Sequence, residues 1–267
     1  MAGIAAVPSL IAFILLVIGG ALTLDLEPGR GLTDAIDNPS RIDGLFIERA
    51  MIRANDNLAI LSAEAPISSP LLTDGTAFVQ LIDEFKHAFE STVVDLPRNM
   101  LINFPQLLAN MHIVVVVTEL TLSGARDGIR ILSWLKSNAP HTKLIVVANK
   151  VAAGVGEISR SDFETSIERK LNFVIPHDVK AAANAAKLGQ TFVGANRAAK
   201  TTAAIRAIVD MIVATEGDHE DAAPAKGGKL GGQKGAKGAQ AAAGTPKSTA
   251  SVGFAIKKLL AKSKANA

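Results

Sequence analysis

Polar side chains follow three apolar, β-branched runs of the sequence, at the points where buried strands are expected to end. Asp95 closes the run STVVD, Asn149 and Lys150 close KLIVVANK, and Pro176 and Asp178 close NFVIPHD. In open parallel sheets, ligands bind at the carboxyl ends of the strands. These five residues are therefore the candidates for chemistry.

Each candidate has a functional and a purely structural interpretation. The Asp95 carboxylate could hold Mg²⁺ or its water beside a nucleotide, or it could simply cap a strand end. The Asn149 amide donates and accepts hydrogen bonds, which suits the edge of a purine base, but Asn is also a common turn residue. Pro176 and Asp178 predict either a base-contacting loop or a rigid turn. The residues alone leave these alternatives open.

The composition excludes several classes of site. The chain of 267 residues has no cysteine, which rules out disulfides, thiolate zinc sites and cysteine nucleophiles. Its five histidines show no metal-ligand spacing, and no Ser-His-Asp arrangement stands out. Aromatic residues make up 4% of the chain, which argues against a stacking platform for single-stranded nucleic acid.

The elements that would position these residues alternate along the chain. Short runs that are apolar on both faces are typical of parallel strands covered by helices. Such strands are expected at 58–63, 91–95, 112–118, 143–149 and 172–176. Helical spacing occurs at 76–90, 123–138, 159–170 and 188–215. The pattern predicts an α/β fold, a doubly wound and mostly parallel sheet with flanking helices.

The N-terminal segment is apolar. Residues 4–24 carry no charge, and about 21 residues at about 1.5 Å each would cross a bilayer core. Pro8, the Gly19-Gly20 pair and the lack of preceding Lys or Arg weaken that interpretation. Residues 1–21 are therefore a candidate membrane anchor, and the alternative is a buried strand or helix of a water-soluble core.

The C-terminal part has a different composition. Residues 222–267 contain nine lysines and no acid, although the whole chain has a net charge of +3. Residues 217–252 are expected to be a disordered linker rich in Gly, Ala and Lys, since such a sequence cannot form a core. Residues 253–267 form a short basic amphipathic segment. The lysines could contact nucleic-acid phosphates without sequence specificity or anionic lipid, or simply aid solubility.

Several segments together resemble a known family. They are VVDLPRNMLINFPQLL, VVVVTELTLSGARDGIRILSWLK, KLIVVANKV, EISRSDFE, FVIPHD and LDLEPGRGLTDAIDNPSRIDGLFIERAM. They are similar to the pilus assembly proteins of CpaE (TadZ) type, which belong to the MinD/ParA group of deviant Walker ATPases. The similarity covers about residues 22–215, and the domain is taken as 22–216.

The resemblance implies a P-loop NTPase-like fold and roles for the candidate residues. Asp95 would correspond to the Walker B aspartate that serves Mg²⁺. Asn149 and Lys150 would lie on the adenine side, together with the loop from Pro176 to Asp178. ATP and Mg²⁺ are thus implied as cofactors by resemblance only. The partners it implies are the pilus secretion machinery and a second subunit, in the bacterial cytoplasm or at the inner membrane through residues 4–24.

The sequence departs from the family at its glycine-rich phosphate loop. That loop presents successive backbone N–H groups and a lysine to the phosphates, and it should precede residue 22. The first 20 residues contain no lysine and no Gly-Lys-Ser/Thr. The chain is therefore expected to be an N-terminally incomplete or divergent member.

The favoured hypothesis for its function is an assembly or localisation factor for Flp (tight-adherence) pili with ATP binding and hydrolysis impaired or lost. The alternative is an active ATP-dependent switch. Specific nucleic-acid recognition is not expected.

Overall fold

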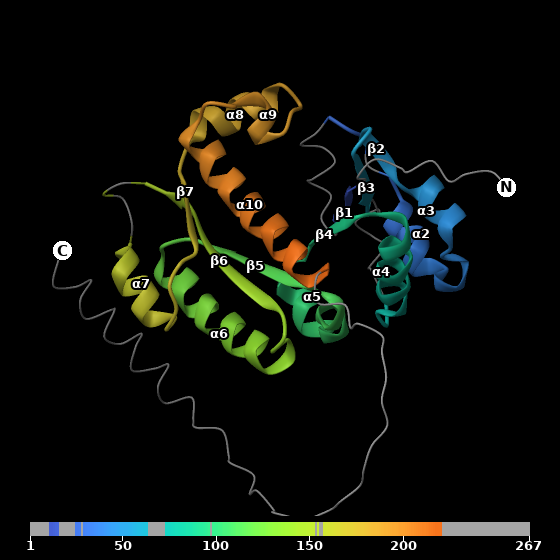
Figure 1. Cartoon of the computed structure of the whole chain (residues 1–267), viewed down its shortest axis with the longest axis horizontal. Coiled ribbons are helices and arrows are strands. Elements are labelled where there is room, and N and C mark those ends of the chain that lie inside the picture. Colours follow the sequence, from blue (N-terminus) through green and yellow to red (C-terminus); the bar gives the residue numbers. More distant parts are fainter. Residues whose placement is uncertain are drawn as a thin grey trace, which may run out of the picture. The chain divides into compact units, whose positions relative to one another are not determined.

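The computed structural model describes residues 11–15, 25–27, 29–63, 73–96, 98–152, 154 and 157–220. Helices and strands alternate along them, as Figure 1 shows, in agreement with the predicted α/β class. The chain forms two compact units. Of the described residues, the first unit contains those up to 114 together with 135–144 and 178–202, and the second contains 115–134, those between 145 and 177, and 203–220.

The first unit contains a four-stranded sheet in the order β2-β3-β1-β4. Its strands are β1 (Ile11–Leu15), β2 (Ile52–Asn55), β3 (Leu58–Ser62) and β4 (Ser91–Asp95). β1 pairs in parallel with β3 on one side and β4 on the other. β2 runs antiparallel to β3 and forms a hairpin with it, which the sequence patterns had not indicated.

The strand β1 bears on the interpretation of the apolar N-terminal segment. Residues 11–15 have backbone partners on both edges, so they form a central strand of the sheet and not part of a helix. The rest of residues 4–24 lies outside the described residues. Among the helices that the structure describes, none combines the length and the apolar character needed to cross a bilayer.

Helix α4 (Thr76–Ala88) provides five of the eleven buried residues in the core cluster of the first unit. They follow the spacing of one helical face and are Ala77, Phe78, Leu81, Ile82 and Phe85. They pack with α2 (Gly31–Asp37), α3 (Gly44–Ala50) and β3, beside which α4 is drawn in Figure 1. The first unit also contains three short helices, η1 (Pro39–Arg41), α5 (Arg98–Asn103) and η2 (Pro105–Asn110).

A three-stranded sheet in the order β5-β6-β7 follows. Its strands are β5 (Ile113–Thr118), β6 (Lys143–Val151) and β7 (Phe173–Pro176), with β6 and β7 parallel. Between them in the sequence are α6 (Leu122–Asn138) and α7 (Arg160–Ser166). α6 approaches α7 closely at Gly128, where an added Cβ would lie 3.2 Å from Cγ2 of Ile167.

The C-terminal region corrects one prediction. The single helix expected at 188–215 is replaced by α9 (Phe192–Ala195) and α10 (Lys200–Glu220), and α8 (Val179–Lys187) precedes them where no helix was expected. Gly189 ends α8 with φ +57°, a left-handed conformation that stops a helix, and Thr191 caps α9. α10 continues to Glu220, past the expected boundary at 216. The rest of the expected linker and the basic segment 253–267 lie outside the described residues.

Two glycines that each begin a helix allow a matched test of the packing. At Gly31 an added Cβ would lie 2.6 Å from the Ala50 carbonyl oxygen and from Cδ1 of Leu61, whereas at Gly44 nothing lies within 4 Å. We expect Gly31→Ala to lower the free energy of unfolding by about 1–3 kcal/mol through overpacking. Gly44→Ala should be neutral or slightly stabilising. Urea unfolding of both variants measures this, and equal effects would contradict the described packing of α2.

Candidate functional site

Asp95 lies at the carboxyl end of the first sheet, as the sequence predicts. It is the last residue of β4 and its side chain is exposed. In the strand register Asp95 is opposite Leu15 of β1, and Leu15 is opposite Ser62 of β3. Three strand ends therefore meet at one edge, which is where an open α/β sheet binds its ligand.

Ser62 holds a loop at this edge, a role that sequence reasoning missed. It is only 1% exposed, and its Oγ accepts a hydrogen bond from Gly29 N at 2.8 Å. The same hydroxyl donates to Gly29 O at 3.1 Å. A buried hydroxyl needs such partners, and a serine that ends an apolar run was the one available signal. The segment just before α2 is thus fixed to the carboxyl end of β3.

Asn149 and Lys150 form an irregularity near the end of β6. The register between β6 and β7 shifts between Ala148 and Val151, which marks a bulge. Lys150 has φ +53°, in the left-handed region that non-glycine residues rarely occupy. Oδ1 of Asn149 accepts from Lys150 N at 2.9 Å, so part of the Asn149 amide stabilises this turn. The Asn149 side chain therefore takes part in a turn.

The Lys150 side chain has a partner. Its Nζ lies 2.8 Å from Oε1 of Glu119, the residue that follows β5. Both side chains are about half exposed, so the pair contributes little to stability, about 0–1 kcal/mol. Its effect is electrostatic: the ammonium at this edge is compensated by a carboxylate, which lowers its attraction for an anionic ligand.

Pro176 and Asp178 have separate local roles. Pro176 ends β7 opposite Val151, and the next N–H, that of His177, donates to Val151 O at 3.0 Å. Asp178 is the N-cap of α8, and its Oδ1 accepts from Ala181 N at 2.9 Å. The structure therefore brings Asn149, Lys150 and Pro176 together at the end of β6 and β7, and uses Asp178 as a helix cap.

A hollow of about 280 Å³ lies where β5 ends and α6 begins. The side chain of Thr121 caps α6, accepting from Gly124 N at 2.9 Å. A carboxylate oxygen of Glu157 accepts from Leu122 N at 2.9 Å, which suits the positive end of the helix dipole. Protein groups thus already satisfy these helix N-terminal donors, which an anion would otherwise use.

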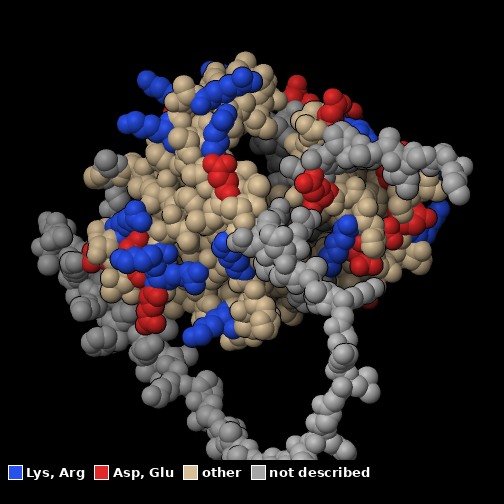
Figure 2. Space-filling view, in the orientation of Figure 1, with Lys and Arg blue, Asp and Glu red and all other residues tan. Residues whose placement is uncertain are grey.

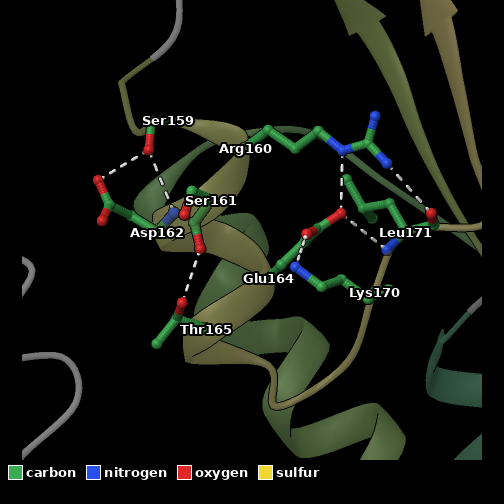
Figure 3. A network of polar contacts seen from close by, with 8 residues as sticks. All are labelled: Ser159, Arg160, Ser161, Asp162, Glu164, Thr165, Lys170 and Leu171. Carbon is green, nitrogen blue, oxygen red and sulfur yellow. Dashed lines mark hydrogen bonds and ion pairs between the residues drawn. The ribbon is translucent and has the colours of Figure 1, made fainter.

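Glu164 is the centre of a polar network in the second unit (Figure 3). Its carboxylate is 7% exposed and lies 2.9 Å from Nε of Arg160 and 2.8 Å from Nζ of Lys170. Leu171 N also donates to it, at 3.1 Å. These three donors, Lys170 first, lower the pKa of the Glu164 carboxyl to about 2. These contacts connect α7 to Lys170 and Leu171, in the segment that precedes β7.

The depressed pKa of Glu164 predicts a pH dependence of stability. A carboxyl group with a lowered folded-state pKa stabilises the fold above its unfolded value, about 4.5, and loses that effect as the pH falls towards 2. We expect Glu164→Gln to lower the free energy of unfolding at neutral pH. The difference in this free energy between variant and wild type should disappear as the pH falls from about 4.5 to about 2. Denaturant titrations at several pH values in this range measure it.

Glu48→Gln is the control for this prediction, because Glu48 lies exposed on α3. It should change the free energy of unfolding by less than about 0.5 kcal/mol. If the free energy of unfolding of Glu164→Gln differs from that of wild type by the same amount down to about pH 2, the network does not act through the ionised carboxylate.

Few of the described side chains lie where they could bind a metal ion together. Within the residues that the structure describes, no group of three or more His, Asp or Glu side chains could hold a metal ion. Mg²⁺ often binds through one or two carboxylates together with substrate phosphates. Asp95 could supply one such ligand, but only if a bound nucleotide supplied the others.

Comparisons with known proteins support the fold. The sequence matches no family model, and it matches no curated protein. The structure is similar to a ParA family ATPase from Chlorobium tepidum TLS, with a TM-score of 0.64, 15% identity, and coverage of 74% of this chain and 84% of that one. It is also similar to the MinC:MinD cell division protein complex of Aquifex aeolicus, with a TM-score of 0.60, 18% identity, and coverage of 82% and 86%.

A third similar structure is the septum site-determining protein MinD complexed with Mg-ADP from Pyrococcus horikoshii OT3. Its TM-score is 0.54 at 14% identity, with coverage of 73% of this chain and 79% of that chain. At such identities the similarity concerns the fold alone. The α/β fold of the MinD/ParA ATPases, predicted from the sequence, is thereby confirmed.

Proposed function

We propose that this protein is a localisation or assembly factor for a Flp (tight-adherence) type IV pilus, of CpaE/TadZ type, with ATP binding and hydrolysis impaired or lost. The pilus role comes from the sequence resemblance over about residues 22–215. The shared fold with MinD and ParA ATPases supports the wider group.

The segment after β1 carries the proposal that nucleotide binding is impaired. In this fold class a triphosphate needs backbone N–H groups and a lysine at the carboxyl edge of the sheet. Residues 16–30, between β1 and α2, contain no lysine and include Asp25 and Glu27. Their one basic residue, Arg30, lies 3.5 Å from Asp34 on α2. Mg-ATP therefore does not fit the residues present here.

The residues that the resemblance assigns to the adenine side belong to the second unit. Asn149, Lys150 and Pro176 lie together at the end of β6 and β7, and this local arrangement supports that part of the proposal. Without phosphate contacts, base contacts alone give weak binding, because the phosphates supply the main positioning interactions. An active ATP-dependent switch, the alternative function, would have to obtain phosphate contacts from another source such as a partner subunit.

The expected partners follow from the same proposal. The chain would act as a homodimer that contacts the pilus secretion machinery from the cytoplasm, at the inner-membrane surface. The apolar residues before β1 and the basic segment 253–267 are the parts that would favour such a surface.

Asp95→Ala tests the nucleotide part of the proposal. Because the lysine of a phosphate loop is missing, we expect phosphate release with Mg²⁺ and ATP to stay at background for wild type and variant alike. The substitution at an exposed strand end should cost about 1 kcal/mol of stability or less. A clear wild-type rate that the variant loses would refute this and establish the active switch.

The pilus part has a genetic test. Deleting the gene from its host should abolish Flp pili on the cell surface, and wild type and Asp95→Ala should restore them equally. Pili that persist in the deletion strain would overturn the proposed function. Restoration by wild type but not by Asp95→Ala would instead show that the role depends on this carboxylate.

A further inference from the structure

An open hollow of about 700 Å³ lies between α8 and residues 194–199, which end α9 and lead to α10. Small-molecule sites in proteins usually have volumes of about 300–1,000 Å³. All residues that line the hollow lie between 178 and 199, within the first unit. Of the candidates predicted from the sequence only Asp178 is among them, and its carboxylate already caps α8. The hollow is therefore distinct from the candidate site at the sheet edges.

The residues that line the hollow are polar or small. Two cations, Lys180 and Arg197, and two amides, Asn184 and Asn196, line it together with Asp178, and its other lining residues are glycine or alanine. An apolar ligand would therefore find no large apolar side chain among them to pack against. A hydrophilic ligand with negative charge is the kind that these residues favour.

The two cations of the hollow are available to a ligand. Among the described residues, neither Lys180 nor Arg197 has an ion-pair or hydrogen-bond partner. Residues 178–202 contain four cations and one acid, a net charge of +3. In Figure 2 blue side chains gather where Figure 1 draws α8 and α9. Both cations therefore keep their attraction for an anion, unlike Lys150, whose charge Glu119 compensates.

Asn196 fixes the wall of the hollow that carries Arg197. Its Nδ2 donates to Ala181 O at 2.9 Å and to Phe192 O at 3.2 Å, which ties the end of α9 to α8. The backbone carbonyl of Asn196 accepts from Oγ1 of the buried Thr202 at 2.6 Å. The backbone beside Arg197 is therefore held in place before any ligand arrives, which lowers the entropy that binding costs.

We propose that this hollow binds a small phosphorylated molecule through Lys180, Arg197 and Asn184. The planar arginine side chain matches two oxygens of one phosphate group, and the lysine provides a point charge for a second. Nδ2 of Asn184 lies 3.4 Å from Oδ1 of Asn196, longer than the usual range of about 2.7–3.2 Å. A ligand oxygen can therefore replace that weak bond at little cost.

A small ligand suits the hollow better than a nucleic-acid backbone does. Nucleic acid binds without specificity through many cations that contact successive phosphates. Here two cations, one from α8 and one from the segment after α9, line a single concave site. The site uses neither Asp95 nor the ends of β6 and β7, so it does not rest on the proposed function.

Isothermal titration calorimetry of the full chain with pyrophosphate tests the proposal, without Mg²⁺ and at about 0.1 M ionic strength. Wild type should bind one pyrophosphate per chain in a saturable way. Lys180→Gln with Arg197→Gln should weaken this binding at least about tenfold, because two charge-assisted contacts are lost. A wild type without saturable binding up to about 1 mM pyrophosphate overturns the proposal. The lysine-rich residues 222–267 are present in every chain compared, so they cannot cause a difference.

Lys187→Gln with Lys200→Gln is the matched control. This pair makes the same change of charge within residues 178–202, at two exposed positions that do not line the hollow. Because salt screens charges at longer range, the affinity of this control for pyrophosphate should stay within about twofold of wild type. Equal weakening by both pairs would attribute the binding to the general charge of the segment and refute the site.

Asn184→Asp is a second variant, and it keeps both cations. It places a carboxylate in the hollow at an exposed position of α8. Repulsion between like charges should weaken pyrophosphate binding several-fold while urea unfolding stays unchanged. Undiminished binding by this variant contradicts the assigned contacts, and it does so even if the double variant does not fold.

A short DNA duplex separates a small ligand from a nucleic acid. Lys180→Gln with Arg197→Gln should weaken pyrophosphate binding and keep the affinity of wild type for the duplex, because the lysines of residues 222–267 remain available to its phosphates. A loss of duplex affinity as large as the loss of pyrophosphate affinity would assign the two cations to a nucleic-acid surface and overturn the proposal.

Discussion

The parallel pairing of β1 with β3 and β4 is the constraint on which the first unit depends. This pairing places Leu15, Ser62 and Asp95 at the same level of the sheet. Ser62 then fixes Gly29 to that edge, two residues before α2 begins. Any ligand at this edge would meet a segment whose charged residues are two acids and an arginine already close to Asp34.

At the edge of the other sheet, polar groups are also largely satisfied from within the protein. Lys150 is paired with Glu119, part of the Asn149 amide stabilises a bulge, and Glu157 accepts from the first turn of α6. These interactions leave fewer unpaired hydrogen-bonding groups at this sheet edge for a ligand.

The sequence predicted the elements whose signal is local. The β-branched runs located β3 to β7, and apolar spacing located α4 and α6. It missed α8, whose apolar residues are mostly small alanines, and it merged α9 and α10, which the turn from Asn196 to Ala199 separates. At the site, Asp95 at the end of its strand was predicted. The bulge at Lys150 and the bond from Ser62 to Gly29 were not, since each depends on residues that are distant in the sequence.

The central position of β1 also has a consequence for the order in which the chain folds. β2 and β3 are neighbours in sequence and can pair as a hairpin early, but β1 is separated from its β4 partner by eighty residues. Contacts of such high sequence separation form late, because the loop between them must first be closed. During synthesis the first sheet cannot be completed until β4 has left the ribosome. Until then the edge of β1 that pairs with β4 stays unpaired even if β3 has already paired with the other edge, and an unpaired strand edge is prone to aggregate.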